Sequence, residues 1–508
     1  MPKLTGSVFS VDVTGLETAA GQPAYARICD RIRTAITSGA LAPNARLPSS
    51  RVLAKDLGVA RNTVDSALGQ LVADGYIVRR RGAGSFVAEQ LPERDAPPLR
   101  RRRVAAPKPA VAERRVSQRA KALQSYPGHY RPLTGIPFTP SLPPIDLFPR
   151  KVWNRLLSRE SARAGADYWA YGASNGLPAL REAISAHASA MRATRCSPDQ
   201  VIVVTSTQQA VELAGKVIAD PGDSAWVETP GYQPVQHCLR AAGLQVVPVP
   251  VDEQGLDVHA GRTIEPRARL AYVTPAHQYP MGYEMSLARR KALLDWAEEQ
   301  DAYIVEDDYD GDYRYEGRPI ASLQGMDERG RVVYVGSFNK ILFPALRIAF
   351  VIVPESLVCA FVDAKHVADG HTALLMQGVL AAFIHEGHLA RHLRKTRAIY
   401  DERRLAFLEE AKVLADVIEF GPARAGMHVT GIFRSDVARG VDERAVAAEC
   451  ARAGIEVHPL SKYGATDRSG LVFGFAGASR AAARSGLQIV RRAIAACGSP
   501  RKASAARQ

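Results

Sequence analysis

The chain has 508 residues, more than one hydrophobic core usually holds, so we expect two to four domains. Its 46% hydrophobic and 23% charged residues are ordinary for a soluble protein, and no apolar run approaches the roughly 18 residues of a membrane span. The N-terminus lacks the apolar core of a signal peptide, and the six cysteines lack the paired spacing of a zinc site or a disulfide framework. We therefore expect a cytoplasmic protein with no metal site and no membrane partner.

The net charge of +14 is spread unevenly along the chain. Residues 1–128 contain 21 lysines and arginines against 10 acidic residues, whereas residues 129–508 contain 45 against 42. A basic block confined to about a quarter of a chain is typical of a protein that binds a polyanion. The alternative is a solvated basic tail.

The first predicted elements are three short helices and a hairpin. Helical spacing of apolar residues predicts a helix over 24–38, and a serine cap precedes a short helix that ends near residues 57–58. A third helix is predicted over 60–74, and two strands, 76–80 and 85–89, flank a turn of arginine and glycine. Three helices and a hairpin in about 65 residues indicate a winged helix-turn-helix, to which we assign residues 20–89.

Two regions of different character follow. Residues 90–128 are rich in proline, alanine and arginine, which predicts an exposed linker. From residue 129 to about 495, short apolar runs alternate with helical stretches, which is typical of an α/β domain with a mostly parallel sheet. A basic helix opens the last part, about 380–495, where we expect a smaller α/β subdomain. The strands are predicted at Val201–Val204, Ala225–Glu228, Gln245–Val249, Leu270–Val273, Tyr303–Glu306, Val332–Gly336 and Ile348–Val353.

The start of the third helix carries residue types that read base edges. Arginine suits guanine and asparagine suits adenine, because each forms a bidentate pair in the major groove. Arginines in the second helix and in the hairpin turn suit phosphate contacts, and glycines let that turn approach the duplex. A winged helix that contacts protein is the alternative. The candidate DNA-binding residues are Arg51, Arg61, Asn62, Thr63, Arg79, Arg80 and Gly82.

This segment also resembles a known family. The run RLPSSRVLAKDLGVARNTVDSALGQLVADGYIVRRRGAGSFV is similar to the GntR family of bacterial regulators, over about residues 22–89. The resemblance implies that Arg51, Arg61, Asn62 and Thr63 meet double-stranded DNA.

In the α/β region, side chains that pyridoxal 5'-phosphate (PLP) requires follow the predicted strands. PLP needs a lysine for a Schiff base, an acid for its pyridine nitrogen, a hydroxyl donor for its 3-oxygen, and a phosphate cradle. Lys340 follows one strand, and Asp307 with Tyr309 follows another. Open α/β sheets bind ligands at such strand ends. The candidate cofactor residues are Lys340, Asp307, Tyr309, Ser337, Arg347, Ser206, Thr207, Tyr232 and His277.

Each of these signals has a plainer interpretation. Asp307 lies in the stretch EDDYDGD, which is compatible with a solvated acidic loop or a site for a hard metal ion. Ser206 is compatible with a helix cap and Tyr232 with core packing. His277 alone is more often structural, and a lone lysine is usually a surface residue. The order of these residues and their shared place at strand ends favour the cofactor.

That order resembles fold-type I aminotransferases over residues 129–495. The whole chain resembles the MocR subfamily of GntR regulators, on the stretches YGASNGLPALREAI, TPAHQYPMG, VEDDYDGDYRY and GSFNKILFPALRIAFVIVP. The resemblance implies a Schiff base at Lys340, a ring-nitrogen partner at Asp307 and a 3-oxygen contact at Tyr309. It also implies phosphate contacts at Ser206, Thr207, Ser337 and Arg347, a stacking aromatic at Tyr232, and His277 near the ring.

The chain departs from the pattern of these enzymes at three points. Ser206 stands where glycine is usual, and Asn339 stands where serine or threonine is common. The late strand GLVFGFAG contains no arginine to hold a substrate carboxylate. Arg424 and Arg468 are the nearest substitutes in the sequence, so the acidic-group contact stays open.

The expected function is a PLP-dependent transcription regulator that senses a small amine, amino acid or related metabolite at Lys340. The resemblance also implies a homodimer, because fold-type I sites form between two subunits. One alternative is an aminotransferase, capable of half-transamination, that has kept a DNA-binding head. Another is a winged-helix repressor whose PLP site has decayed.

Overall fold

The computed structural model describes residues 23–91, 116–117, 120–121, 135–317 and 320–498. The chain divides into two compact units, residues 1–114 and residues 115–508. Most of the linker predicted at 90–128 lies outside the described residues, so its boundaries stay a prediction. Among the described residues, no helix is both long enough and apolar enough to cross a membrane.

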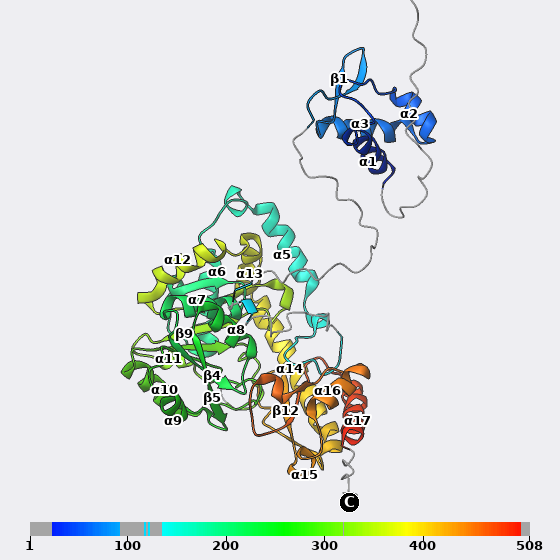
Figure 1. The fold of residues 1–508 in the computed structure, drawn as a ribbon. Helices are drawn as coiled ribbons and strands as arrows, with labels where there is room; N and C mark the ends of the chain where they lie inside the picture. The colour runs from blue at the N-terminus through cyan, green and yellow to red at the C-terminus, as the bar shows by residue number, and fades with distance from the viewer. Residues whose placement is uncertain (1–22, 92–115, 118–119, 122–134, 318–319, 499–508) are drawn as a thin grey trace, which may run out of the picture. The chain divides into compact units, whose positions relative to one another are not determined.

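The first unit is a three-helix bundle with an antiparallel hairpin, drawn in blue in Figure 1. Its core gathers the apolar face of each helix and the inner side of the hairpin. The predicted elements are confirmed to within a few residues at each end. They are α1 (Ala24–Thr37), α2 (Ser50–Leu57), α3 (Arg61–Ala73), β1 (Ile77–Arg80) and β2 (Gly84–Val87).

Local sequence sets the ends of α2. The Ser49 hydroxyl accepts a hydrogen bond from the Val52 N–H at 3.4 Å, which caps the first turn. Gly58 ends the helix with φ of +64°, a left-handed conformation that glycine adopts without strain. These two signals fix the short turn between α2 and α3, and so fix where α3 begins.

The second unit contains an eight-stranded sheet in the order β3-β10-β9-β8-β7-β4-β5-β6. The pairs β5–β4, β4–β7, β7–β8 and β8–β9 are parallel, whereas β10 runs antiparallel to both β9 and β3, and β6 runs antiparallel to β5. The prediction of a mostly parallel sheet is confirmed. The strands are β3 (Val201–Val204), β4 (Ser224–Thr229), β5 (Gln245–Asp252), β6 (Gly255–Leu256), β7 (Leu270–Val273), β8 (Tyr303–Asp308), β9 (Val332–Ser337) and β10 (Ala349–Ile352).

Helices cover both faces of this sheet, as its continuous apolar strands require. Side chains that alternate along the strands pack on one face against α7, α8 and α12, and on the other against α9, α10 and α11 at one end and α6 and α13 at the other. These helices are α5 (Arg150–Arg163), α6 (Pro178–Arg192), α7 (Thr207–Ile218), α8 (Gln233–Ala242), α9 (Val258–Ile264), α10 (Leu287–Glu299), α11 (Leu323–Met326), α12 (Val358–Asp369) and α13 (Leu374–His385).

A smaller lobe follows the long helix α14, which runs toward it from the sheet (Figure 1). It holds a four-stranded antiparallel sheet in the order β11-β12-β14-β13, packed against α16 and α17. The predicted C-terminal subdomain is therefore present. Its elements are α14 (His388–Glu410), β11 (Ile418–Phe420), β12 (His428–Phe433), α15 (Ser435–Ala438), α16 (Glu443–Arg452), β13 (His458–Pro459), β14 (Gly470–Gly474) and α17 (Arg480–Cys497).

Short 3₁₀ turns join several of these elements. The turn η4 connects the lysine-bearing loop to β10, and η7 connects β13 to the segment before β14. The 3₁₀ segments are η1 (Ile145–Leu147), η2 (Ala166–Tyr168), η3 (Pro198–Gln200), η4 (Pro344–Leu346), η5 (Glu355–Leu357), η6 (Ala411–Leu414) and η7 (Leu460–Tyr463).

Candidate functional site

The predicted base-reading residues begin helix α3 and lie on its exposed side. Arg61 and Asn62 are exposed and Thr63 is half-buried, while Val64 and Leu68 pack into the core. The Arg61 side chain is 59% exposed, and its Nε lies 3.4 Å from the hydroxyl of Ser50, the first residue of α2. This arrangement presents polar side chains to solvent at the start of α3, as a recognition helix requires.

The hairpin β1–β2, which we call the wing, presents arginines unequally. Arg79 is exposed, whereas the Arg80 guanidinium lies 4.8 Å from the Phe86 ring centroid and donates to the Asn44 side-chain oxygen at 3.1 Å. Gly82 has φ of +75° in the turn, a conformation that favours glycine. Arg51, on α2, is also exposed. Arg80 therefore helps to hold the wing together, and Arg79 is the freer cation.

In the second unit, the predicted cofactor residues follow strands whose ends share one edge of the sheet. Since β4, β7, β8 and β9 are parallel neighbours, the loops after them meet at this edge. Tyr232 follows β4, His277 follows β7, and Lys340 follows β9. Strand topology thus brings together residues that lie up to about a hundred positions apart in the sequence.

Lys340 and Asp307 form the centre of this edge. The Lys340 ammonium donates to the Ser141 carbonyl at 2.9 Å, and burial lowers its pKa although Asp310 and Asp307 act to raise it. One Asp307 oxygen accepts from the Tyr272 hydroxyl at 2.5 Å. Burial raises the pKa of Asp307 to about 7, and the carboxylates of Asp308 and Asp310 add to that rise.

The other Asp307 oxygen, Oδ1, is buried and has no hydrogen-bond partner among the described residues. A buried acceptor without a donor is costly. A protonated ring nitrogen placed here would satisfy Oδ1 and favour the ionised carboxylate. Asp307 therefore fits the role of partner to a pyridine nitrogen.

A second group of side chains lies beside Lys340, in the loops after β7 and β8. The Tyr309 hydroxyl lies 3.0 Å from Nδ1 of His277, and the same nitrogen lies 3.2 Å from both carboxylate oxygens of Asp310. Gly426 allows this close packing: with φ of +76°, it lies where a Cβ would collide with the His277 ring and lie 2.6 Å from Asp310 Oδ2. Tyr309 and His277 are predicted from the sequence as site residues, whereas Asp310 is not.

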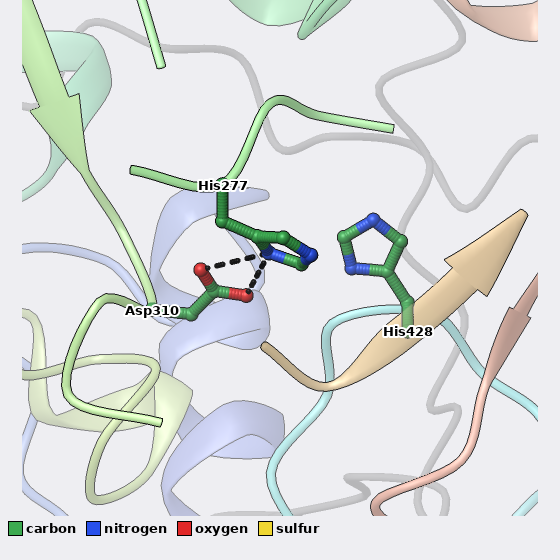
Figure 2. Close-up of side chains that lie close together, drawn as sticks. All are labelled: His277, Asp310 and His428. Carbon is green, nitrogen blue, oxygen red and sulfur yellow. Dashed lines mark hydrogen bonds and ion pairs between the residues drawn. The ribbon is translucent and has the colours of Figure 1, made fainter. Parts of the chain in front are cut away.

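His428, at the start of β12, completes this group from the smaller lobe (Figure 2). Its ring centroid lies 4.9 Å from that of His277, and its Nε2 lies 3.0 Å from the Pro280 carbonyl oxygen. Burial, together with His277 and Lys340, lowers its pKa well below the usual value. No sequence signal marked His428, because its partner lies about 150 residues earlier in the chain.

The phosphate-side residues gather around the start of α7. Ser206 caps that helix, its hydroxyl accepting from the Gln209 N–H at 3.2 Å, and Thr207 is its first residue. Ser206 and Arg347 line a common cavity of about 430 Å³. Helix N-termini and arginine both favour anions, so these residues fit a phosphate group. The cavity is lined by Ser206, Gln208, Gln209, Glu212, Leu213, Lys216, Arg347 and Ala368.

One departure from the expected pattern, Asn339, has a structural explanation. Asn339, beside the lysine, donates to the Thr205 carbonyl at 3.3 Å and accepts from the Ile348 N–H at 3.1 Å. The Ser337 hydroxyl accepts from the Asn339 N–H at 3.3 Å. Asn339 therefore ties the lysine loop to the strand that precedes α7, a positioning task.

Tyr232 lies at the start of α8, half-buried, with its ring centroid 6.0 Å from that of Tyr279. The Tyr279 hydroxyl in turn lies 3.0 Å from that of Tyr463. These rings form a buried aromatic wall together with Tyr309 and Met281. An aromatic ring of this kind suits stacking on a planar cofactor.

The two arginines that the sequence offered as contacts for an acidic group lie outside the cluster of cofactor residues. Arg424 is 67% exposed, with its nearest acidic partner Glu316 at 3.9 Å, and Arg468 is exposed, 3.4 Å from the Tyr283 hydroxyl. Taken together, the described residues fit PLP at its lysine, ring nitrogen, 3-oxygen and phosphate. They offer no buried arginine from β14 or its neighbours for an acidic group.

Comparison with known proteins agrees with this geometry. Residues 24–87 match the family of bacterial regulatory proteins of the gntR type, and residues 147–484 match the aminotransferase class I and II family. The probable rhizopine catabolism regulatory protein MocR of Rhizobium meliloti is 36% identical over 484 residues, which cover 95% of this chain and 96% of that one.

Two further proteins show the range of similarity. The pyridoxine biosynthesis transcriptional regulator PdxR of Corynebacterium glutamicum is 28% identical over 88% of this chain and 91% of that one. The crystal structure of the Pyrococcus horikoshii kynurenine aminotransferase, in complex with PMP, is 25% identical with a TM-score of 0.65, over 76% of this chain and 95% of that one. The chain therefore belongs to the MocR-type regulators, which join a GntR helix-turn-helix to an aminotransferase class I and II domain.

Proposed function

We propose that this protein is a PLP-dependent transcription regulator whose affinity for promoter DNA changes when a small amine, amino acid or related metabolite binds beside Lys340. The observation that carries the proposal is the joining, in one chain, of an exposed polar α3 to a buried Lys340–Asp307 site. When bound, PLP would supply an aldehyde carbon that can bond to the amino group of a lysine or of an effector, and a ring system that absorbs visible light. Such a protein would act in the cytoplasm, beside its DNA.

Each candidate cofactor residue of the second unit has a role in this proposal. Lys340 anchors the cofactor, and Asp307 holds the ring-nitrogen proton through the oxygen that lacks a partner. Tyr309 donates to the 3-oxygen, because the Asp310 carboxylate holds the Nδ1 proton of His277 and so leaves the phenol proton free. Ser206, Thr207, Ser337 and Arg347 bind the phosphate, and Tyr232 stacks on the ring.

In the first unit, Arg61 and Asn62 would read bases from the start of α3. Thr63, Arg51, Arg79, Arg80 and Gly82 would place the helix and the wing against the phosphate backbone. Two copies of the chain would then read a repeated site.

A homodimer is supported by two aromatic side chains that the described residues leave mostly exposed. Tyr171 is 99% exposed and Trp169 is 66% exposed, in the segment before α6. That segment is tied to β3 by the Val203 N–H, which donates to the Asn175 carbonyl at 3.0 Å. Exposed aromatic rings beside a ligand edge are typical of an interface. A second copy is the occupant that we propose, and sedimentation equilibrium of the full chain would test it.

The proposal is tested by measuring promoter affinity with and without PLP and with a panel of amines. We expect PLP or an amine to change the affinity by at least several-fold. Identical binding under all conditions would contradict the proposal. The aminotransferase fold also keeps a second function open, an aminotransferase with a DNA-binding head. Repeated turnover with an amino donor and 2-oxoglutarate would support that second function.

A further inference from the structure

The buried imidazoles of His277 and His428 have a hydrogen-bonding need that the described residues do not meet. The two side chains are 2% and 0% exposed. Among the described residues, neither Nε2 of His277 nor Nδ1 of His428 has a hydrogen-bond partner. Figure 2 shows the two rings side by side, with Asp310 behind His277. Since buried polar atoms are nearly always paired, these two nitrogens indicate that another group binds between the rings.

Their other contacts determine which protons the rings carry. His428 Nε2 faces the Pro280 carbonyl, which only accepts, so this nitrogen carries the proton of a neutral ring. Nδ1 of His428 is then an acceptor. His277 Nδ1 faces both oxygens of Asp310, and an ionised carboxylate requires the proton on that nitrogen. With the Nδ1 proton directed at Asp310, Nε2 is the His277 nitrogen that can accept a hydrogen bond.

The surrounding charges also favour a donor over an acid. Asp310 contacts His277, and the cation that acts on His428 is Lys340, the residue that would bond to the cofactor. β14 contains no arginine, and Arg424 and Arg468 are exposed, with their own contacts outside the pair. An acidic ligand group placed here would meet lone pairs and carboxylates, whereas an ammonium or hydroxyl would meet acceptors.

We propose that His277 and His428 form a double-acceptor subsite that binds the second polar group of the effector, and that this group is an ammonium or a hydroxyl. The effector is then a diamine or an amino alcohol, in preference to an amino acid or an amino sulfonate. The inference rests on the proposed function, since it assigns a ligand class to the site beside Lys340.

The spacing admits a hydrogen-bond donor. The ligand atoms of His277, Asp310 and His428 lie within 4.8 Å of one another. A tetrahedral donor about 2.9 Å from each of two acceptors would hold them about 4.7 Å apart. A zinc ion, with bonds of about 2.0–2.1 Å, would draw two nitrogens to about 3.4 Å. A metal ion is therefore the competing occupant, and the experiment below includes it.

The test uses the full-length protein loaded with PLP and titrated with matched small probes. The donors are 1,3-diaminopropane and 3-amino-1-propanol, the acids are β-alanine and taurine, and propylamine is the amine without a second polar group. Visible absorbance of the bound cofactor and promoter affinity are followed together. We expect both donors to act at concentrations about tenfold or more below propylamine, because each adds a hydrogen bond that involves a charged or buried group. The acids should act no better than propylamine.

Variants of His428 separate recognition from folding. In His428→Leu the Pro280 carbonyl keeps a donor, because the Thr430 hydroxyl also bonds it at 2.5 Å. We expect its response to 1,3-diaminopropane to fall to the propylamine level. His428→Asn places an amide oxygen near the position of Nδ1 and should restore most of the response. Propylamine has no second polar group, so its response in each variant reports on the rest of the cofactor site.

His392→Leu is the matched control. His392 is also buried and its Nε2 bonds the Ile341 carbonyl at 3.1 Å, which the Tyr313 hydroxyl bonds as well. It does not face the His277–His428 pair, so the preference for donors should persist in this variant.

Three results would overturn the inference alone, with PLP and DNA binding normal. One is a preference for β-alanine or taurine, and another is an unchanged 1,3-diaminopropane response in His428→Leu. The third is stoichiometric binding of Zn²⁺ alone to chelator-treated wild-type protein, measured by calorimetry and lost in His428→Leu. Failure to take up PLP or to bind the promoter would overturn the proposed function, and this inference with it.

Discussion

The two units place their functional side chains in opposite environments. In the first unit Arg61, Asn62 and Arg79 are exposed and contribute little to the core. In the second unit Asp307 and His277 are buried, and each contacts other polar side chains within about 3 Å. Exposed DNA-binding residues can therefore change with little effect on stability, whereas a change in the cofactor site alters proton positions and folding together.

The largest expected effect is that of Lys340→Ala, which tests whether the two units can be separated. This variant should lose the visible absorbance of lysine-bound PLP and its response to amines. Its DNA affinity without PLP should stay within about twofold of the wild-type value, because the DNA-binding residues lie in the other unit. Loss of DNA binding by a folded variant would show that the units are not separable in this way.

The second effect is a pH dependence of stability in the cofactor-free protein. Asp307 and Glu228 have pKa values raised to about 7 by burial, against roughly 4 in the unfolded chain. The folded state thus binds more protons than the unfolded state between these values, so the free energy of unfolding falls as pH rises from about 4 to about 7. The decrease should be no more than about 4 kcal/mol for each of the two groups.

Denaturant titrations of wild type and of Asp307→Asn at pH 4.5 and pH 7.5 would measure this decrease. The variant should show a smaller decrease, and added PLP should shrink the wild-type decrease, since a protonated ring nitrogen would stabilise the ionised carboxylate. An equal decrease in the free energy of unfolding for wild type and variant would show that Asp307 is not the group that titrates.

A smaller effect is expected for Arg61→Ala in the first unit. If Arg61 pairs with a base edge, the change should cost about 1–3 kcal/mol of DNA binding and relax sequence preference at one position. The thermal midpoint should hardly move, because the side chain is 59% exposed. Fluorescence anisotropy with promoter and scrambled duplexes would measure both quantities, and an equal loss on both duplexes would exclude base reading.

The smallest effect concerns the wing. Arg79→Ala should weaken binding to all duplexes alike. It should also reduce the steepness of log affinity against log salt concentration by about one, as expected for the loss of one phosphate contact. Arg80→Ala should also lower stability, because Arg80 packs on Phe86 and bonds Asn44. Equal thermal midpoints for the two variants would contradict this distinction.

The same contrast explains how much the sequence could predict. The winged helix depends on local signals, such as the Ser49 cap and Gly58, and its elements are confirmed to within a few residues. Strands such as Val201–Val204 and Leu270–Val273 are confirmed without change, because buried strands are continuous apolar runs. Helical periodicity and strand composition are properties of a short window of sequence, so they can be recognised without knowledge of the fold.

The partners within the cofactor site could not be predicted in this way. Tyr272 reaches Asp307 from the neighbouring strand, and Ser141 reaches Lys340 from about 200 residues earlier. His428 comes from the smaller lobe. Nothing local marks these contacts, because they depend on strand order and on how the smaller lobe packs. The unpartnered nitrogens of His277 and His428 are likewise a property of the assembled site alone.

The central claim is that the PLP site and the DNA-binding unit are energetically coupled, and linkage tests it directly. If an amine such as 1,3-diaminopropane changes the promoter affinity of the PLP-loaded wild type by some factor, promoter DNA must change the affinity for that amine by the same factor. For wild type we expect the change in promoter affinity and the change in amine affinity to be equal and at least several-fold. In Lys340→Ala we expect no change in either affinity. A factor of one in both directions for wild type, across diamines, amino alcohols and amino acids, would contradict the account.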